Sequence, residues 1–234
     1  MKRRLLLDTW SNPRGVVFDG STSYAELTRP AALASWTAWS VSLWAMFPSV
    51  PGSEPVLNLF GGATATSGWT VDKAGTSLTY ALRSHFAGAG TKTIFTSPYT
   101  ITAGQWAHLL LSYDGSIVRG YLNGSALATT HAVSSELLNW GSDSALRLAR
   151  RASTYAAVAL DELSLWDHAV TPAQVRQAST GRPRDLGGQA GLGYWWRLGD
   201  RFVSGINLLP AVQPGAPAWT WTNGNPATQL ITGA

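Results

Sequence analysis

The sequence contains no cysteine, and only 13% of its 234 residues are charged. The lack of cysteine excludes disulfide bonds and metal sites built on thiolates, so the fold must be stabilised by packing alone. Apolar runs are short as well. Leu5-Leu6-Leu7 is followed directly by Asp8, which is too short a run for a signal peptide, and no stretch approaches the ~20 residues of a membrane span. We therefore expect no membrane association and a protein made in the cytoplasm without a signal peptide.

Charge gives little reason to expect nucleic-acid binding. The formal net charge is only +4, and the basic residues are scattered along the chain. The densest groups are Lys2-Arg3-Arg4, Arg147 with Arg150-Arg151, and Arg182 with Arg184. A terminal group such as the first is typical of a solvated end rather than of a phosphate-binding surface. We expect no nucleic-acid partner.

The residues that are abundant favour short strands and tight turns. The chain is 45% hydrophobic and contains 12 tryptophans, 24 glycines and 12 prolines, and a chain of this length can bury a full core as one domain. Alternating segments separated by turn residues predict an all-β antiparallel sandwich. The expected strands cover residues 15–18, 24–27, 39–47, 56–60, 69–72, 78–83, 93–96, 106–113, 117–122, 126–129, 146–149 and 157–166.

Two turn sequences in the middle of the chain predict hairpins. Asp114-Gly115-Ser116 and Asn123-Gly124 each separate alternating segments. Such residues tolerate the positive φ values that tight hairpin loops require. We therefore expect three consecutive strands to form a meander here.

One strand leads directly into the helix that we expect. Alternation over 157–166 places Asp161 on the face of Leu163 and Leu165. If that face is the inner one, this carboxylate must be satisfied by N–H groups, a hydroxyl or a cation.

The start of the short helix after this strand is clearly marked. Thr171 fits the N-cap, Pro172 the first helical position, and Gln174 the third position of a capping box. Val170 and Val175 flank the cap as a hydrophobic staple.

Four segments, taken in order, resemble the laminin-G-like, concanavalin-A-like jelly roll. The segments are VVFDGSTSYAEL (16–27), WSVSLWAMFPS (39–49), AGQWAHLLLSYDGSIVRGYLNGSALA (103–128) and LRLARRASTYAAVALDELSLWDHAVTPAQV (146–175). The resemblance implies this fold, with structural roles for Trp106 and His108 in the Trp-x-His segment and for Trp166 at the end of the last strand. It leaves function open, because the fold hosts lectins, glucanases, adhesion modules and viral structural proteins.

The chain divides into three parts on this interpretation: an N-terminal arm (1–15), the jelly-roll domain (16–180) and a C-terminal extension (181–234). The extension has no charged residue from Phe202 onward. Because disorder normally requires charge and few aromatics, we expect the extension to dock on its own sandwich or on a neighbouring subunit. Its candidate partner-binding residues are Trp195, Trp196, Arg197, Trp219 and Trp221.

No catalytic arrangement is recognisable, and we expect no enzymatic activity. Retaining glycosidases on this fold carry paired carboxylates at Glu-x-Asp-x-x-Glu spacing, whereas Asp161 and Glu162 are adjacent and would face opposite sides of a strand. The four histidines, His85, His108, His131 and His168, are accompanied by no Gly-x-Ser-x-Gly elbow. Their spacing also does not suit a transition metal.

Calcium is the one cofactor that the resemblance makes possible, and we commit to no metal site. The candidate ligands are Asp19, Asp114 and Asp161. The alternative is that Asp19 and Asp114 bond the backbone of their own turns, and that Asp161 ties down a hairpin. We favour this alternative because calcium sites use several carboxylates together.

A sugar-binding function would need an exposed aromatic platform. The candidate side chains for it are Trp36, Trp44, Trp69, Trp140 and Tyr155. Most tryptophans are expected in the core or in an interface, because burial of so large a ring is strongly stabilising.

Among the functions open to the fold, we expect a structural protein of a bacteriophage virion. The segment Tyr194–Asp200 (YWWRLGD) is similar to segments of tailed-phage virion proteins. This resemblance implies a capsid decoration (cement) or tail-associated protein that binds capsid or tail proteins as a homo-oligomer, for which decoration proteins commonly use a trimer. The alternative is a lectin-like module for a host-surface glycan.

Overall fold

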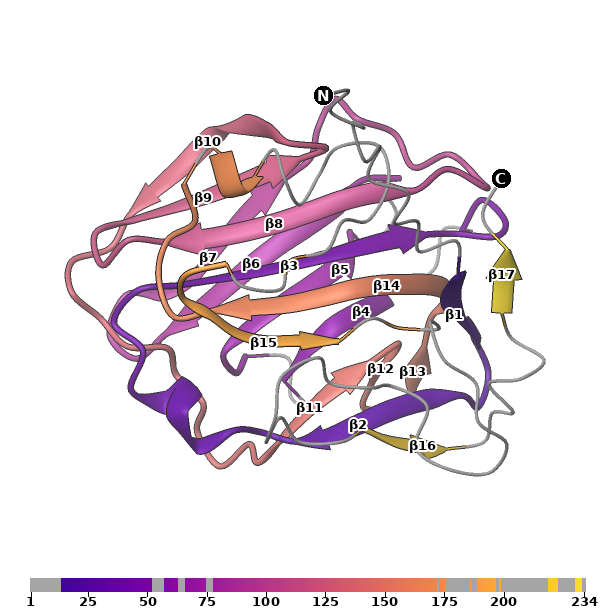
Figure 1. Cartoon of the computed structure of the whole chain (residues 1–234), viewed down its shortest axis with the longest axis horizontal. Coiled ribbons are helices and arrows are strands. Elements are labelled where there is room, and N and C mark those ends of the chain that lie inside the picture. Colours follow the sequence, from indigo (N-terminus) through magenta and orange to yellow (C-terminus); the bar gives the residue numbers. More distant parts are fainter. Residues whose placement is uncertain are drawn as a thin grey trace, which may run out of the picture.

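The structure is a computed structural model. It describes residues 14–51, 57–62, 66–74, 78–171, 173–175, 186, 189–196, 198, 219–222 and 230–232. Within these ranges the predicted all-β class is confirmed: two antiparallel sheets pack face to face (Figure 1).

The larger sheet has eight strands and lies in front in Figure 1. Its order is β10 (Ser125–Ala132), β9 (Ile117–Leu122), β8 (Ala107–Tyr113), β3 (Trp39–Met46), β14 (Ala157–Trp166), β1 (Arg14–Asp19) and β17 (Leu230–Thr232). The eighth strand, β15 (Leu192–Trp196), pairs with the second half of β14, whose first half pairs with β1.

The smaller sheet has seven strands. Its order is β16 (Thr220–Thr222), β2 (Tyr24–Thr28), β11 (Ala145–Leu148), β4 (Leu57–Gly62), β5 (Trp69–Lys73), β6 (Tyr80–Phe86) and β7 (Gly90–Phe95). A separate hairpin of β12 (Arg150–Arg151) and β13 (Thr154–Tyr155) follows β11. This hairpin and the 3-10 turn η1 (Ala31–Ala34) were not predicted from the sequence.

The core lies between the two sheets and follows the expected alternation. On β3, Val41, Leu43 and Ala45 are fully buried in it. Ser40 and Ser42 point the other way and are buried too, because the segment after β14 covers part of that outer face: the Ser40 hydroxyl accepts a hydrogen bond from Val170 N (3.0 Å).

Both predicted turns have the expected backbone. Gly115 has φ 90°, Asn123 has φ 49° and Gly124 has φ 81°. These turns join β8 to β9 and β9 to β10, whose antiparallel pairing forms the predicted meander.

The predicted face of Asp161 is wrong. A β-bulge interrupts β14, where Asp161 lies opposite Trp44 but Ser164 lies opposite Ser42, and Glu162 takes φ 49°. The extra residue reverses the alternation, so that Leu160 and Leu163 both face the core. Asp161 therefore lies off the inner face, and its Oδ1 accepts a hydrogen bond from Glu162 N (2.8 Å).

The predicted helix start is confirmed in its contacts. Gln174 N donates to Thr171 Oγ1 (3.3 Å), and Thr171 N donates to Gln174 Oε1 (2.8 Å), as a capping box requires. The staple residues Val170 and Val175 are buried together in a second apolar cluster, on the outer side of the larger sheet. Residues 173–175 are helical, whereas Pro172 lies outside the described residues.

The C-terminal strands dock on the chain's own sandwich. β15 pairs with β14, β16 with β2, and β17 with β1. This is one of the two arrangements expected for the extension 181–234, much of which lies outside the described residues, as does the arm up to residue 13. The three-part division of the chain stays a prediction.

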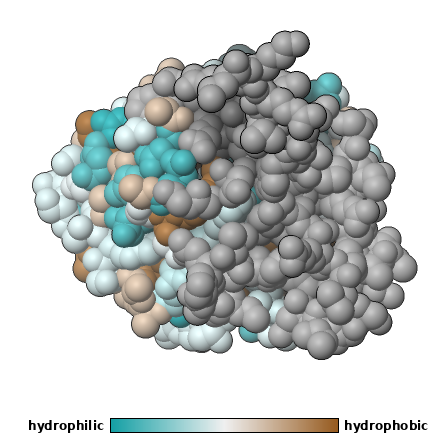
Figure 2. Space-filling model, in the orientation of Figure 1, coloured by the Kyte–Doolittle hydropathy of each residue, from teal (hydrophilic) through white to brown (hydrophobic). Residues whose placement is uncertain are grey.

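The outer face of the larger sheet is in view in Figure 2, where its coloured part carries hydrophilic side chains around β8, β9 and β10.

Among the described residues, none belongs to a helix with the length and apolar character needed to cross a bilayer.

Candidate functional site

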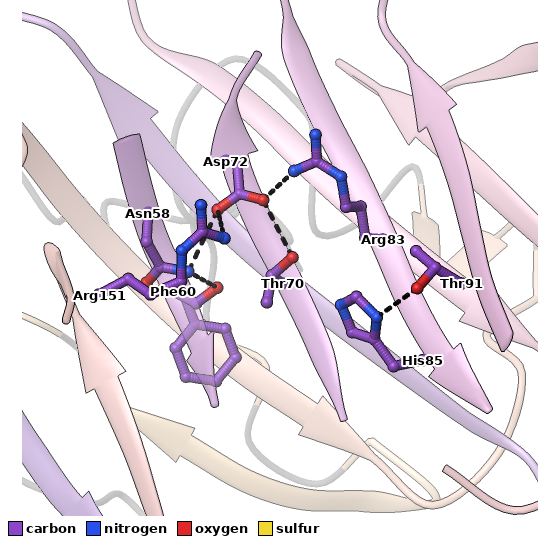
Figure 3. Close-up of polar contacts among 8 residues, drawn as sticks. All are labelled: Asn58, Phe60, Thr70, Asp72, Arg83, His85, Thr91 and Arg151. Atoms are coloured by element: carbon purple, nitrogen blue, oxygen red, sulfur yellow. Dashed lines mark hydrogen bonds and ion pairs between the residues drawn. The ribbon is translucent and has the colours of Figure 1, made fainter. Parts of the chain in front are cut away.

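A group of polar side chains occupies the outer face of the seven-stranded sheet. On β5, Trp69 and Val71 point into the core, so Thr70 and Asp72 point outward. The antiparallel register then places Arg83 of β6 opposite Thr70, and Asn58 of β4 opposite Asp72. We call Asn58, Thr70, Asp72, Arg83, His85 and Arg151 the Asp72 cluster (Figure 3).

Asp72 is the centre of this cluster. Its side chain is 0% exposed, and Nη1 of Arg83 contacts its Oδ2. Nη1 of Arg151 lies 3.3 Å from its Oδ1. Thr70 Oγ1 donates to Oδ2 (3.0 Å), and Asn58 Nδ2 donates to Oδ1 (3.2 Å). The carboxylate is therefore held by two guanidinium groups, a hydroxyl and an amide, as Figure 3 shows.

The electrostatic balance of the cluster is positive. Burial raises the pKa of Asp72, and the nearby charges of Arg151 and Arg83 oppose that change. Because two guanidinium groups share one carboxyl group, positive charge remains in excess whether or not Asp72 is ionised.

His85 extends the cluster along β6. Its Nδ1 lies 2.8 Å from Thr91 Oγ1. Burial, assisted by the charges of Arg83 and Arg151, lowers the pKa of His85 to about 4. The imidazole is therefore neutral at pH 7.

The β12–β13 hairpin links this cluster to a second polar group at β2. Arg151 reaches Asp72, whereas the neighbouring guanidinium of Arg150 lies 4.2 Å from the ring centre of Tyr24 and 5.3 Å from that of Tyr155. Beside them Arg147 of β11 donates to Glu26 of β2 through Nε (2.6 Å).

Sequence reasoning did not identify the Asp72 cluster. The available signal was a Thr70-x-Asp72 pair in the expected strand 69–72 and an Arg83-x-His85 pair that begins at the last residue of the next expected strand, 78–83. Each pair lies on one face of its strand, but the register that brings the pairs together is not evident from the sequence.

The expectation that the C-terminal tryptophans form a partner surface is corrected, because three of them are buried within the chain itself. Trp195, Trp196 and Trp219 are at most 2% exposed, within the chain itself. Trp196 contacts Trp219 edge to face at 5.6 Å. Trp221 is half-buried and stacks on Phe18 at 5.0 Å. Burial of a large ring is favourable, and the chain's own sheets provide it; Arg197 lies outside the described residues.

Most of the aromatic side chains considered for a sugar-binding platform are buried and cannot form one. Trp69 is 0% exposed, and Trp44 and Trp140 are each 5% exposed. Trp36 and Tyr155 are half-buried. Trp69 points inward because it alternates with Thr70, which takes the outer face.

Three of the residues predicted to be structural make contacts that the structure describes, and their structural roles stay a prediction. His108 is 0% exposed, and its Nε2 lies 2.7 Å from Ser42 Oγ. Trp166 is buried and donates through Nε1 to Ser164 Oγ (3.0 Å). Trp106 packs over Gly15, where an added Cβ would lie 2.6 Å from the indole.

The calcium candidates bond backbone groups nearby. Asp19 accepts hydrogen bonds from the backbone N–H groups of Ser21, Thr22 and Ser23. Partial burial acts to raise the pKa of Asp19, but these hydrogen bonds outweigh it and hold the pKa well below its usual range. Asp114 accepts from Ser116 N (2.9 Å) and Ile117 N (2.7 Å). These contacts are the turn bonding expected of both residues. Within the described part of the chain, no three His, Asp or Glu side chains form a group suited to a metal ion.

Comparison with known proteins agrees with the fold. The family model Laminin_G_3, described as the concanavalin A-like lectin/glucanases superfamily, matches residues 19–176. No curated protein matches the chain.

Solved structures with the same fold include proteins from distant sources. A native heptameric SAP-like pentraxin from Limulus polyphemus has a TM-score of 0.55 at 18% identity, over 74% of this chain and 86% of the pentraxin. The binding domain of Paraclostridial Mosquitocidal Protein 1 has a TM-score of 0.53 at 14% identity, over 69% of this chain and 44% of that domain. The botulinum neurotoxin serotype D binding domain has a TM-score of 0.54 at 10% identity, over 72% of this chain and 42% of that domain.

This chain thus spans most of the pentraxin but less than half of each toxin domain. At these identities the similarity concerns the fold. Because the family model covers more than half of its length, the chain belongs to the concanavalin A-like lectin/glucanases superfamily.

Proposed function

We propose that this chain is a non-enzymatic recognition protein whose ligand contacts the outer face of the seven-stranded sheet. The observation that carries the proposal is the Asp72 cluster, in which one carboxylate is held by two arginines. A retaining glycosidase needs two carboxyl groups about 5 Å apart, one as nucleophile and one as acid. A carboxylate engaged by two guanidinium groups instead orients those groups for binding.

The biological setting that we propose is a bacteriophage virion, as a capsid decoration or tail-associated protein. Its support is the similarity of Tyr194–Asp200 to segments of virion proteins. Because Trp195, Trp196 and Trp219 are used inside the chain, contacts with capsid or tail proteins would use other surfaces.

A second candidate, glycan recognition, is favoured by the polar character of the Asp72 cluster. Amide, hydroxyl and guanidinium groups are the side chains that orient sugars and other polar ligands. Two of the similar structures are named as toxin binding domains, which is consistent with a recognition role but does not assign a ligand.

The test uses the full-length protein in three assays. Recognition predicts retention on particles or on immobilised glycans, with no release of reducing ends from polysaccharides. Arg83→Gln should weaken retention, and Arg119→Gln is the matched control because its ion pair with Asp114 lies on the surface of the other sheet. Release of reducing ends that is lost in Asp72→Asn would overturn the non-enzymatic proposal.

The same assays separate the two candidates. Retention on purified phage particles without glycan binding would support a virion contact alone. Retention on glycans that is lost in Arg83→Gln would support the second candidate. If the full-length protein binds neither particles nor glycans, the recognition proposal is wrong.

A further inference from the structure

The Asp72 cluster contains more hydrogen-bond donors than acceptors. Each guanidinium group has five N–H donors, and the only protein partner found for those of Arg83 and Arg151 in the described residues is Asp72. The arginine side chains are 18% and 16% exposed, whereas Asp72 is 0% exposed. The guanidinium groups therefore form the outward layer of the cluster, with donors available to an acceptor.

Two buried polar atoms in the cluster have no hydrogen-bond partner. They are Oδ1 of Asn58 and Nε2 of His85, in residues that are 1% and 3% exposed. Figure 3 shows this imidazole nitrogen on the ring edge that faces Thr70, while the other nitrogen is bonded to Thr91. A buried polar group without a partner costs free energy, so each of these atoms gains a hydrogen bond from any ligand group that reaches it.

The rest of the outer face of the seven-stranded sheet also carries more positive than negative charge. Arg147 is neutralised by Glu26, whereas Arg150 is stacked on Tyr24 and Tyr155. Counting Arg83, Arg147, Arg150 and Arg151 against Asp72 and Glu26, four arginines face two carboxyl groups. The field over this face therefore favours an anion.

We infer that the Asp72 cluster binds a sugar carrying a carboxylate or sulfate group. The oxyanion would accept hydrogen bonds from Arg83 and Arg151, whose planar donor groups match such anions. A ring hydroxyl would donate to Asn58 Oδ1, and a second would pair with His85 Nε2. This inference rests on the second candidate of the proposed function, that the ligand is a glycan.

An acidic sugar fits these atoms better than an acidic peptide does. Asn58 Oδ1 needs a donor close to the anion, and a uronate carries hydroxyl donors on the same ring as its carboxylate. An aspartate or glutamate side chain carries only acceptors, and its nearest donor is the backbone N–H, which is already hydrogen-bonded inside a helix or in a strand that is paired on both sides. The mixture of strong donors and one unpaired acceptor thus favours a sugar.

The test is titration of the full-length protein with glucuronate, followed by calorimetry or NMR, beside glucose as the neutral analogue. We expect glucuronate to bind about tenfold more tightly than glucose, since a charge-assisted hydrogen bond is strong, and to bind more weakly at ~0.5 M salt. Arg83→Gln and Arg151→Gln should each lower the affinity about tenfold. Arg83→Lys, which keeps the charge but removes the planar donor group, should also lower it. Arg119→Gln is the control, and thermal unfolding checks that each variant folds.

Several outcomes would overturn the inference. They are equal affinity for glucose and glucuronate, equal affinity for inorganic sulfate and glucuronate, or unchanged affinity in folded Arg83→Lys. Competition by a poly-glutamate peptide at equal strength would identify an acidic protein as the ligand instead. Neutral-glycan binding that is independent of Arg83 would contradict this inference but leave the glycan candidate intact, whereas absence of all glycan binding would contradict both.

Discussion

Ser42 Oγ and His108 Nε2 lie 2.7 Å apart on neighbouring strands, β3 and β8, and both residues are buried. The His108 ring also packs on Trp44, with 5.3 Å between ring centres. Burial lowers the pKa of His108 to about 3. The neutral imidazole is therefore part of the packed structure, and its protonation is coupled to unfolding.

The first prediction is a loss of stability in mild acid caused by His108. In the unfolded chain this imidazole takes up a proton near pH 6.5, whereas in the folded chain it does so only near pH 3. Between these values the unfolded state binds more protons, so the free energy of unfolding falls as the pH falls, by up to about 1.4 kcal/mol per pH unit.

Urea unfolding of the wild type and of His108→Gln from pH 7 to pH 4 measures this effect. The variant should be less stable at pH 7 but should lose less stability on acidification. His131→Gln is the control, because His131 is half-buried on the mostly exposed edge strand β10. Parallel pH profiles for wild type and His108→Gln would contradict the assignment.

The second prediction concerns Asp72→Asn. The substitution leaves Arg83 and Arg151 close together without their shared counter-charge. We expect the free energy of unfolding to fall by about 3 kcal/mol, the magnitude for breaking a buried ion pair. Asp114→Asn is the control, because the side chains of Asp114 and its ion-pair partner Arg119 are each about one-third exposed. This substitution should lower the free energy of unfolding by less than about 1 kcal/mol. Equal losses in urea unfolding would show that Asp72 does not organise the cluster.

The third prediction concerns the turn of the hairpin that carries Arg151. Ala152 is exposed and has φ 51°, and its carbonyl accepts a hydrogen bond from Arg150 Nε (2.9 Å). Left-handed backbone costs a non-glycine residue about 1 kcal/mol. Ala152→Gly should therefore raise the free energy of unfolding by up to about 1 kcal/mol.

Ala126→Gly is the matched control, because Ala126 is also exposed but lies in strand β10 opposite Tyr121 of β9, and its φ is not positive. There glycine should lower stability by about 0.5–1 kcal/mol. Thermal or urea unfolding compares the two variants. If both substitutions lower stability equally, the turn is not strained at Ala152.

The strands and turns could be predicted because their signals are local. The alternation of β3 and the glycine and asparagine turns of the meander depend on neighbouring residues alone. The bulge at Glu162 could not be predicted, because it adds a residue to β14 without a special residue type to mark it. One unmarked bulge was enough to reverse the predicted face of Asp161.

The Asp72 cluster could not be predicted because its members meet only through the sheet register. Asp72 and Arg151 are separated by 79 residues, and Arg151 belongs to a hairpin that alternation did not reveal. Composition likewise indicated many large rings but not their location. Trp195 and Trp196 are adjacent, so they face opposite sides of β15, and both are buried because each side of that strand has its own apolar cluster.

This double burial gives the fourth prediction, which separates a core role from a partner role for Trp196. Its ring packs edge to face on Trp219 at 5.6 Å and is parallel to Tyr194 at 5.6 Å. Trp196→Ala removes a fully buried ring from between the sheets, so the free energy of unfolding should fall by about 3–5 kcal/mol. Trp221→Ala, at a half-buried ring stacked on Phe18, should cost clearly less. Urea unfolding measures both. A Trp196→Ala variant with wild-type stability but lost particle binding would instead assign this ring to a partner surface, because only a ring outside the core can be removed without leaving a cavity.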